Sequence, residues 1–219
     1  MLNVRGRNWA TSVSLSELDN FLNVAAVGAL LTDVEGAYGV VYQARLHEDD
    51  GYKHVLKIVA LNSKTTAQDF TREVNMLRRA SASGFGPKTP EDNFWVKDGE
   101  FGFITMSYWK DGVLSPYKDK CIWSSEALDK LDRYEKFLLN PKWNRSYIDQ
   151  TLPRNILVKL VPTRKRGQAA VIVDFAVGDW GSSKPWSSVH DDKIRANLAN
   201  LCPGVKEIEE RPRKKHKKQ

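Results

Sequence analysis

The sequence predicts an α+β fold in which a small antiparallel sheet with one helix is followed by a mainly helical second part. Short apolar stretches separated by turn residues fill much of residues 30–110, as is typical of strands. One helical pattern interrupts them at residues 66–79, and two more follow at 124–139 and 191–201. The chain of 219 residues is long enough to bury a sizeable core.

Composition indicates an ordinary globular protein, with 41% hydrophobic and 28% charged residues. The longest apolar run, residues 24–31, is far shorter than the ~20 residues that a membrane span needs, so we expect no membrane partner. Cys121 and Cys202 lie far apart and outside any CxxC pair, which argues against a disulfide scaffold or a zinc site. This cysteine usage predicts an intracellular protein, cytoplasmic or nuclear.

Local signals define the elements of the first half. Residues 1–29 are expected to form an N-terminal extension with a frayed start, and Ser14 followed by Glu17 predicts a capped short helix within it. Residues 30–44 (LLTDVEGAYGVVYQA) have a strand–turn–strand pattern, and residues 54–60 (HVLKIVA) form a further strand. After the helix at 66–79, two more strands are expected at 94–97 and 101–109, on either side of the turn Asp98-Gly99-Glu100.

The second half alternates helix and strand before it ends in a basic tail. Strands are expected at residues 158–160 and 170–175, between the two helical patterns. The tail, from Arg211 to Gln219 (RPRKKHKKQ), holds six Lys/Arg and no acid, and without it 28 basic residues face 27 acidic ones. Six of the seven net positive charges therefore come from the tail, which is either a nucleic-acid-binding or nuclear-import segment or a solubilising end.

Two glycines at the first turn could accommodate phosphate. Gly36 and Gly39 lie three apart in GAYGVVY, and glycines there let backbone amides approach an anion without a Cβ in the way. Val41 lies two residues beyond and could pack against a nucleotide base. A plain hairpin turn accounts for the same residues.

A lysine inside an apolar strand is a candidate for pairing. Lys57 is flanked by Leu56 and Ile58, and burial of an unpaired ammonium is costly. Glu73 follows sixteen residues later, near the apolar face of the helix at 66–79. A strand-to-helix pair would hold the lysine toward a phosphate, whereas two solvated surface charges are the alternative.

Carboxylates and an amide near two strands predict a hard-cation site. The apolar stretch VIVDF leads into Asp174, and DQTLPRNILV supplies Asp149 and Asn155 just before another strand. Carboxylate and amide oxygens are suitable ligands for Mg²⁺. Alone, Asp174 could equally be a helix cap or a turn residue.

Taken in order, these motifs resemble the signature set of the protein kinases over residues 30–181: glycine-rich loop, strand lysine, helix glutamate, catalytic loop and DFG. The resemblance implies a two-lobed fold, with an antiparallel-sheet N-lobe at 30–110, a truncated helical C-lobe at 111–208 and the tail at 209–219. It implies ATP and Mg²⁺ as cofactors. The roles that it implies are phosphate covering for Gly36 and Gly39, base packing for Val41, phosphate binding for Lys57 held by Glu73, magnesium binding for Asn155 and Asp174, and proton acceptance for Asp149.

The match departs from the family pattern at several positions. Tyr147-Ile148 replaces His-Arg, Val34 replaces the first loop glycine, and Ala176 replaces the DFG glycine. Asp149 lies one residue further from Asn155 than the family spacing, which would place Gln150 at the base position. Asp179-Trp180-Gly181 is a second near-match to DFG, but Asp174 is preferred because a strand leads directly into it.

The resulting expectation is an atypical or viral-type Ser/Thr kinase acting on a protein substrate. The alternatives are a pseudokinase that binds a regulatory partner, a nucleic-acid-associated protein that works through its tail, and a small-molecule phosphotransferase.

Overall fold

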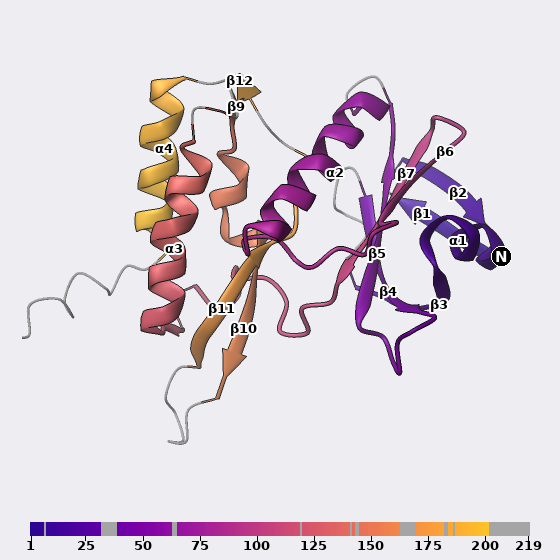
Figure 1. Ribbon diagram of the computed structural model, residues 1–219, viewed down its shortest axis with the longest axis horizontal. Helices are drawn as coiled ribbons and strands as arrows, with labels where there is room; N and C mark the ends of the chain where they lie inside the picture. The colour runs from indigo at the N-terminus through magenta and orange to yellow at the C-terminus, as the bar shows by residue number, and fades with distance from the viewer. Residues whose placement is uncertain are drawn as a thin grey trace, which may run out of the picture.

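The computed structural model describes residues 1–6, 8–31, 39–62, 65–118, 120–140, 142, 145–162, 170–181, 184–185 and 187–201. These residues form an α+β structure with four α-helices and several sheets, most of them antiparallel. A sheet-rich part and a part that contains two long helices lie at opposite ends of the molecule (Figure 1). None of the described helices is long and apolar enough to cross a membrane.

The first part is built on a five-stranded antiparallel sheet with the order β3-β4-β5-β7-β6. Its strands are β3 (Val24–Leu30), β4 (Gly39–Leu46), β5 (His54–Ala60), β6 (Phe94–Lys97) and β7 (Phe101–Ser107). The turn between β6 and β7 places Asp98 and Gly99 in the left-handed region, with φ of 52° and 72°. The strands predicted at 54–60 and 94–97 are confirmed, and the strand predicted at 101–109 is two residues shorter.

The N-terminal segment covers the outer face of this sheet. It forms β1 (Leu2–Gly6), β2 (Trp9–Val13) and α1 (Leu15–Leu22), and the predicted capping box of Ser14 and Glu17 is present. Val4, Val13, Leu18 and Leu22 are fully buried and belong to one cluster with Leu56, Ile58 and Phe103 of the sheet. The expectation of a frayed start was wrong because a few apolar residues, spaced along a polar segment, are enough to complete this outer core.

The inner face of the sheet carries α2 (Ala67–Ala82), with Thr66 as its capping residue; the helix predicted at 66–79 is confirmed and extends three residues further. Side chains alternate between the faces of β5, so Leu56 and Ile58 point outward while Val55 and Val59 join the inner core with Phe70 of α2. The Phe70 ring packs over Gly102, where a Cβ would lie only 2.5 Å from the ring. Lys57 belongs to the inner face by the same alternation.

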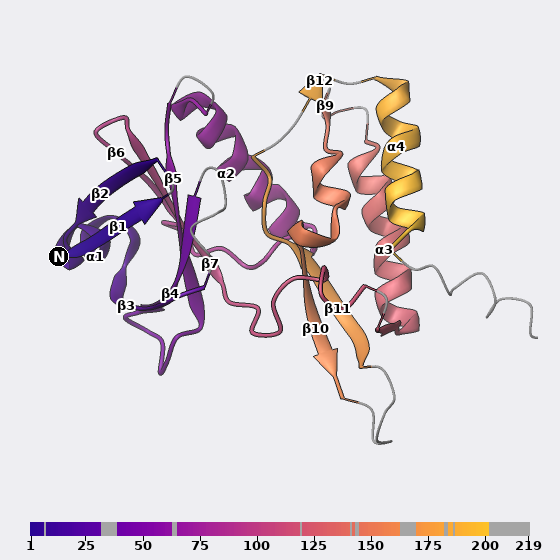
Figure 2. The same cartoon turned by 180° about the vertical axis from the view of Figure 1, so that it is seen from behind.

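The second part continues from the inner core and holds the remaining two helices, α3 and α4, which pack against each other (Figure 2). Its elements are β8 (Ile122–Trp123), α3 (Ser125–Leu138), β9 (Arg145–Ser146), the 3-10 turns η2 (Asp149–Thr151) and η3 (Pro153–Asn155), β10 (Ile156–Val161), β11 (Val171–Val177), β12 (Lys184–Pro185) and α4 (Ser188–Ala199). β10 and β11 are antiparallel, and β8 lies parallel to β11. The helices predicted at 124–139 and 191–201 are confirmed, with α4 starting three residues early.

One hydrophobic cluster spans both parts. It extends from Val55 and Phe70 through Ile104 to Tyr134 of α3, Phe175 of β11 and further residues as far as Leu201. The two parts therefore share a continuous core, and the charged residues considered next lie at the boundary between them.

Candidate functional site

The site is organised around Lys57, which the inner face of β5 presents to α2. Its Nζ lies 2.6 Å from Oε1 of Glu73, and the side chains of the two residues are 15% and 6% exposed. Glu73 is held among the buried residues of α2, so the helix fixes where its carboxylate can reach. The structure thus brings together the strand lysine and the helix glutamate that the sequence singled out.

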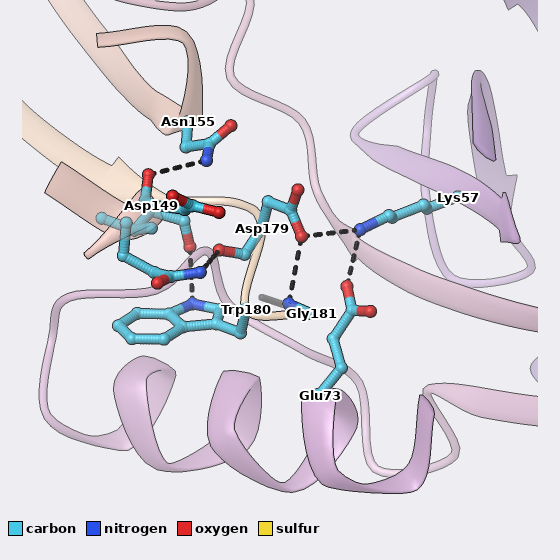
Figure 3. Close-up of polar contacts among 9 residues, drawn as sticks. Lys57, Glu73, Asp149, Asn155, Asp179, Trp180 and Gly181 are labelled. Carbon is cyan, nitrogen blue, oxygen red and sulfur yellow. Dashed lines mark hydrogen bonds and ion pairs between the residues drawn. The ribbon is translucent and has the colours of Figure 1, made fainter. Parts of the chain in front are cut away.

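A second carboxylate reaches Lys57 from the other part of the molecule. Oδ1 of Asp179 lies 3.3 Å from Lys57 Nζ, although the two residues are 122 positions apart. The same Oδ1 accepts a hydrogen bond from the backbone N–H of Gly181, at 3.1 Å. Figure 3 shows Lys57, Glu73 and Asp179 converging from a strand, a helix and the segment after β11.

Asp179 is fixed by the residue that follows it. Trp180 is 2% exposed, and its indole N–H donates to the carbonyl of Val177 at 2.9 Å. The Trp180 ring packs edge-on against Tyr134, Phe137 and Tyr147. Burial of this large ring leaves little freedom for the backbone at Asp179.

Asp174, the preferred sequence candidate for magnesium, lies elsewhere. Strand β11 does not end at Asp174 but continues to Val177, and Asp174 sits opposite Lys159 of β10. Its Oδ1 lies 2.5 Å from Nζ of Lys130 on α3. Asp174 therefore does not contact Lys57, whereas Asp179 does. The sequence signals for Asp179 were Gly181 two residues later and the apolar run from Phe175 to Val177, which prolongs the strand beyond Asp174.

The two turns η2 and η3 place Asp149 beside Asn155. The Asn155 side-chain amide donates to the carbonyl of Asp149 at 2.8 Å, across the extra residue in this loop. The Asp149 side chain points into the same space as Asn155 and Asp179 (Figure 3). From α4, Asn197 donates to the Thr151 hydroxyl at 2.8 Å, which anchors η2 from behind.

Gln150 is turned away from this space. It is fully buried, and its amide N–H donates to the Asp179 carbonyl at 2.9 Å. Of the two residues that could occupy the base position, Asp149 is therefore the one with a partly exposed side chain in the site. Gln150 holds the backbone of Asp179 instead.

The glycine-rich segment is described only in part. Gly36 and Val34 lie outside the described residues, as do Cys202 and the tail from Arg211 to Gln219. Gly39 begins β4, where a Cβ would lie 2.7 Å from the carbonyl oxygen of Ile58. Val41 sits directly opposite Lys57 in the β4–β5 register, and it packs against the core that spans both parts.

Charge coupling dominates the electrostatics around Lys57. Burial disfavours its ammonium form, but the carboxylates of Asp179 and Glu73 outweigh burial and raise the pKa of Lys57. The Lys57 charge lowers the pKa of Asp179 against the effect of burial. Burial raises the pKa of Glu73, and repulsion from Asp179 adds to this effect while Lys57 opposes it. One ammonium thus faces two carboxylates. This excess of carboxylates would favour the binding of a further cation.

Comparison of the chain with known protein families and with curated proteins found no match.

Proposed function

We propose that the chain is a protein-kinase-like phosphotransferase that transfers the γ-phosphoryl group of ATP to a Ser or Thr hydroxyl in the presence of Mg²⁺. The observation that carries the proposal is the double pairing of Lys57, with Glu73 of α2 at 2.6 Å and with Asp179 of the second part at 3.3 Å. Phosphoryl transfer of this kind depends on a lysine held by a helix carboxylate and on a magnesium-binding aspartate from the opposite side.

Each group has a chemical role in this proposal. Lys57 would bind the nucleotide phosphates, and Glu73 would keep its ammonium oriented. Oxygens of Asp179 and Asn155 would hold Mg²⁺, which is usually bound through one or two protein oxygens together with substrate phosphates. The magnesium role first assigned to Asp174 thus passes to Asp179. The bound ion would neutralise charge that develops on the transferred group.

Asp149 is the proposed base, because its carboxylate is partly exposed next to Asn155 while Gln150 is buried. Its carboxylate would accept the proton of the acceptor hydroxyl. The burial of Gln150 supports this choice over the pseudokinase alternative, in which a glutamine would occupy the base position.

Thermal unfolding with and without Mg²⁺–ATP tests the nucleotide site. We expect ATP at about one hundred times its dissociation constant to stabilise the wild-type chain by about 2.7 kcal/mol. Lys57→Met should abolish this gain, whereas Lys130→Met, which removes a lysine with the same side-chain exposure of 15% but outside the site, should retain it.

The comparison is between each variant with and without ligand, so a lower stability of the unliganded variant does not affect it. Equal stabilisation of the wild type and Lys57→Met by Mg²⁺–ATP would contradict the proposed site. Stabilisation of the wild type without phosphate transfer to any acceptor would indicate a nucleotide-binding module instead.

A further inference from the structure

Arg154 is an exposed residue on the turn that also carries Asn155 of the proposed site. It belongs to η3, between Pro153 and the proposed magnesium ligand Asn155. Backbone hydrogen bonds hold this turn in place: the Asn155 N–H donates to Leu152 at 2.9 Å, and the Gly178 N–H donates to the Asn155 carbonyl at 3.1 Å. The second bond joins the turn to the segment that carries Asp179.

Within the described part of the chain, the guanidinium of Arg154 makes no hydrogen bond or ion pair. Lys57, in contrast, is already paired with two carboxylates. Arg154 directly precedes Asn155, and the hydrogen bond from Gly178 to the Asn155 carbonyl joins its turn to the segment of Asp179. An unpaired cation therefore lies next to the residues that would hold magnesium and accept a proton.

We infer that Arg154 selects an acidic acceptor, a protein segment that carries carboxylate or phosphate groups close to the reacting hydroxyl. This inference rests on the proposed function. An acceptor hydroxyl at Asp149 would bring its neighbouring residues to η3, where Arg154 is exposed. The planar guanidinium can bind a carboxylate or phosphate through two parallel hydrogen bonds, and it repels lysine-rich segments.

Two peptides of equal length test the inference, one with a single serine flanked by glutamates and one with the same serine flanked by lysines. Their affinities are measured by fluorescence anisotropy on protein saturated with Mg²⁺ and a non-hydrolysable ATP analogue. We expect the glutamate peptide to bind about fivefold more tightly, as an exposed charge pair allows, and the preference to shrink as salt is added.

Arg154→Glu should reverse the preference, and Arg154→Gln should abolish it. Arg5→Glu is the matched control, because Arg5 is an exposed arginine of β1 on the outer side of the sheet, and its replacement causes the same change in net charge. The control should keep the wild-type preference.

Three outcomes would overturn the inference: equal binding of the two peptides, binding of neither, or a preference that survives in Arg154→Glu. Weaker binding of the nucleotide analogue to Arg154→Glu with an unchanged peptide preference would assign Arg154 to the nucleotide phosphates and would also overturn it. If the wild-type chain fails to bind the nucleotide with Mg²⁺, the proposed function itself is refuted. Nucleotide binding without peptide selectivity refutes only the role of Arg154.

Discussion

Two lysine–aspartate pairs in this molecule look alike by exposure but differ in their surroundings. The side chains of Lys57 and Lys130 are both 15% exposed, and those of their partners Asp179 and Asp174 are 46% and 42% exposed. Lys130 also donates to the Phe175 carbonyl and lies 4.9 Å from the centre of the Phe175 ring, so neutral groups complete its environment. Lys57 has a second carboxylate, Glu73, in that place.

The two lysines therefore differ in the charge balance around them and not in their burial. The Lys130 pair joins α3 to β11 within the second part and is electrically balanced. The Lys57 group joins both parts of the molecule and has two carboxylates for one ammonium. Asp149 adds a third carboxylate nearby, and Arg154 adds a second cation. An excess of carboxylates favours a divalent cation, whereas a balanced pair does not.

The largest expected effect is on the chemistry of the Lys57 region. Asp149→Asn should lower phosphate transfer by about 10²–10⁴-fold, the usual contribution of a general base, while nucleotide affinity stays near that of the wild type. Transfer is measured from labelled ATP to a mixture of dephosphorylated casein and histone. Asp174→Asn is the control from the balanced region and should keep the wild-type rate. Equal rates for the wild type and Asp149→Asn would eliminate Asp149 as the base.

The next largest effect comes from making the same substitution in the aspartate of each pair. Asp179→Asn should weaken Mg²⁺–ATP binding about a hundredfold, because the proposed magnesium carboxylate is lost. At an ATP concentration that stabilises the wild type by about 2.7 kcal/mol, only about 0.4 kcal/mol would then remain. Asp174→Asn should keep the full gain in thermal unfolding. The opposite result, in which Mg²⁺–ATP stabilises Asp179→Asn fully but no longer stabilises Asp174→Asn, would restore Asp174 as the magnesium ligand.

The smallest effect concerns a third pair, Lys97 with Glu17, which attaches α1 to β6. Hydrogen bonds from Lys97 and then from Ser14 lower the pKa of Glu17 from 4.5 to about 2. A lowered pKa of an acid means that its stabilising contribution is complete above the ordinary pKa and is lost as the pH falls toward the folded value.

Glu17→Gln should therefore flatten the loss of stability between about pH 4.5 and pH 2, measured by urea unfolding over that range. Glu73→Gln should not flatten this acid limb, because the pKa of Glu73 is raised, and its charge costs stability as the pH rises. A wild-type slope retained in Glu17→Gln would contradict the role of this pair.

Much of the first part could be predicted from the sequence because its signals are local. The capping box predicted the start of α1, and apolar spacing predicted α2. The two-residue alternation of β5 and the helical spacing of α2 together placed Lys57 toward Glu73. The choice between Asp174 and Asp179 was not local. It depended on where β11 ends, which is decided by the packing of Phe175 and Val177 in a core made by distant segments.

The spacing of residues in the sequence did not predict the position of Asp149 either. An additional residue in the loop suggested that Gln150 replaces the base, yet two successive 3-10 turns absorb the extra residue and bury Gln150 under Asp179. The N-terminal hairpin was missed because each of its strands buries only one or two apolar side chains.

The hydrophobic core that runs from β5 and α2 to α3 and α4 makes folding of the two parts interdependent. Val55, Phe70 and Ile104 of one part are buried together with Tyr134, Ile172 and Phe175 of the other. Unfolding should therefore occur as one cooperative transition. Cutting the chain between β7 and β8 would expose apolar surface on both fragments and would not release two independently stable domains.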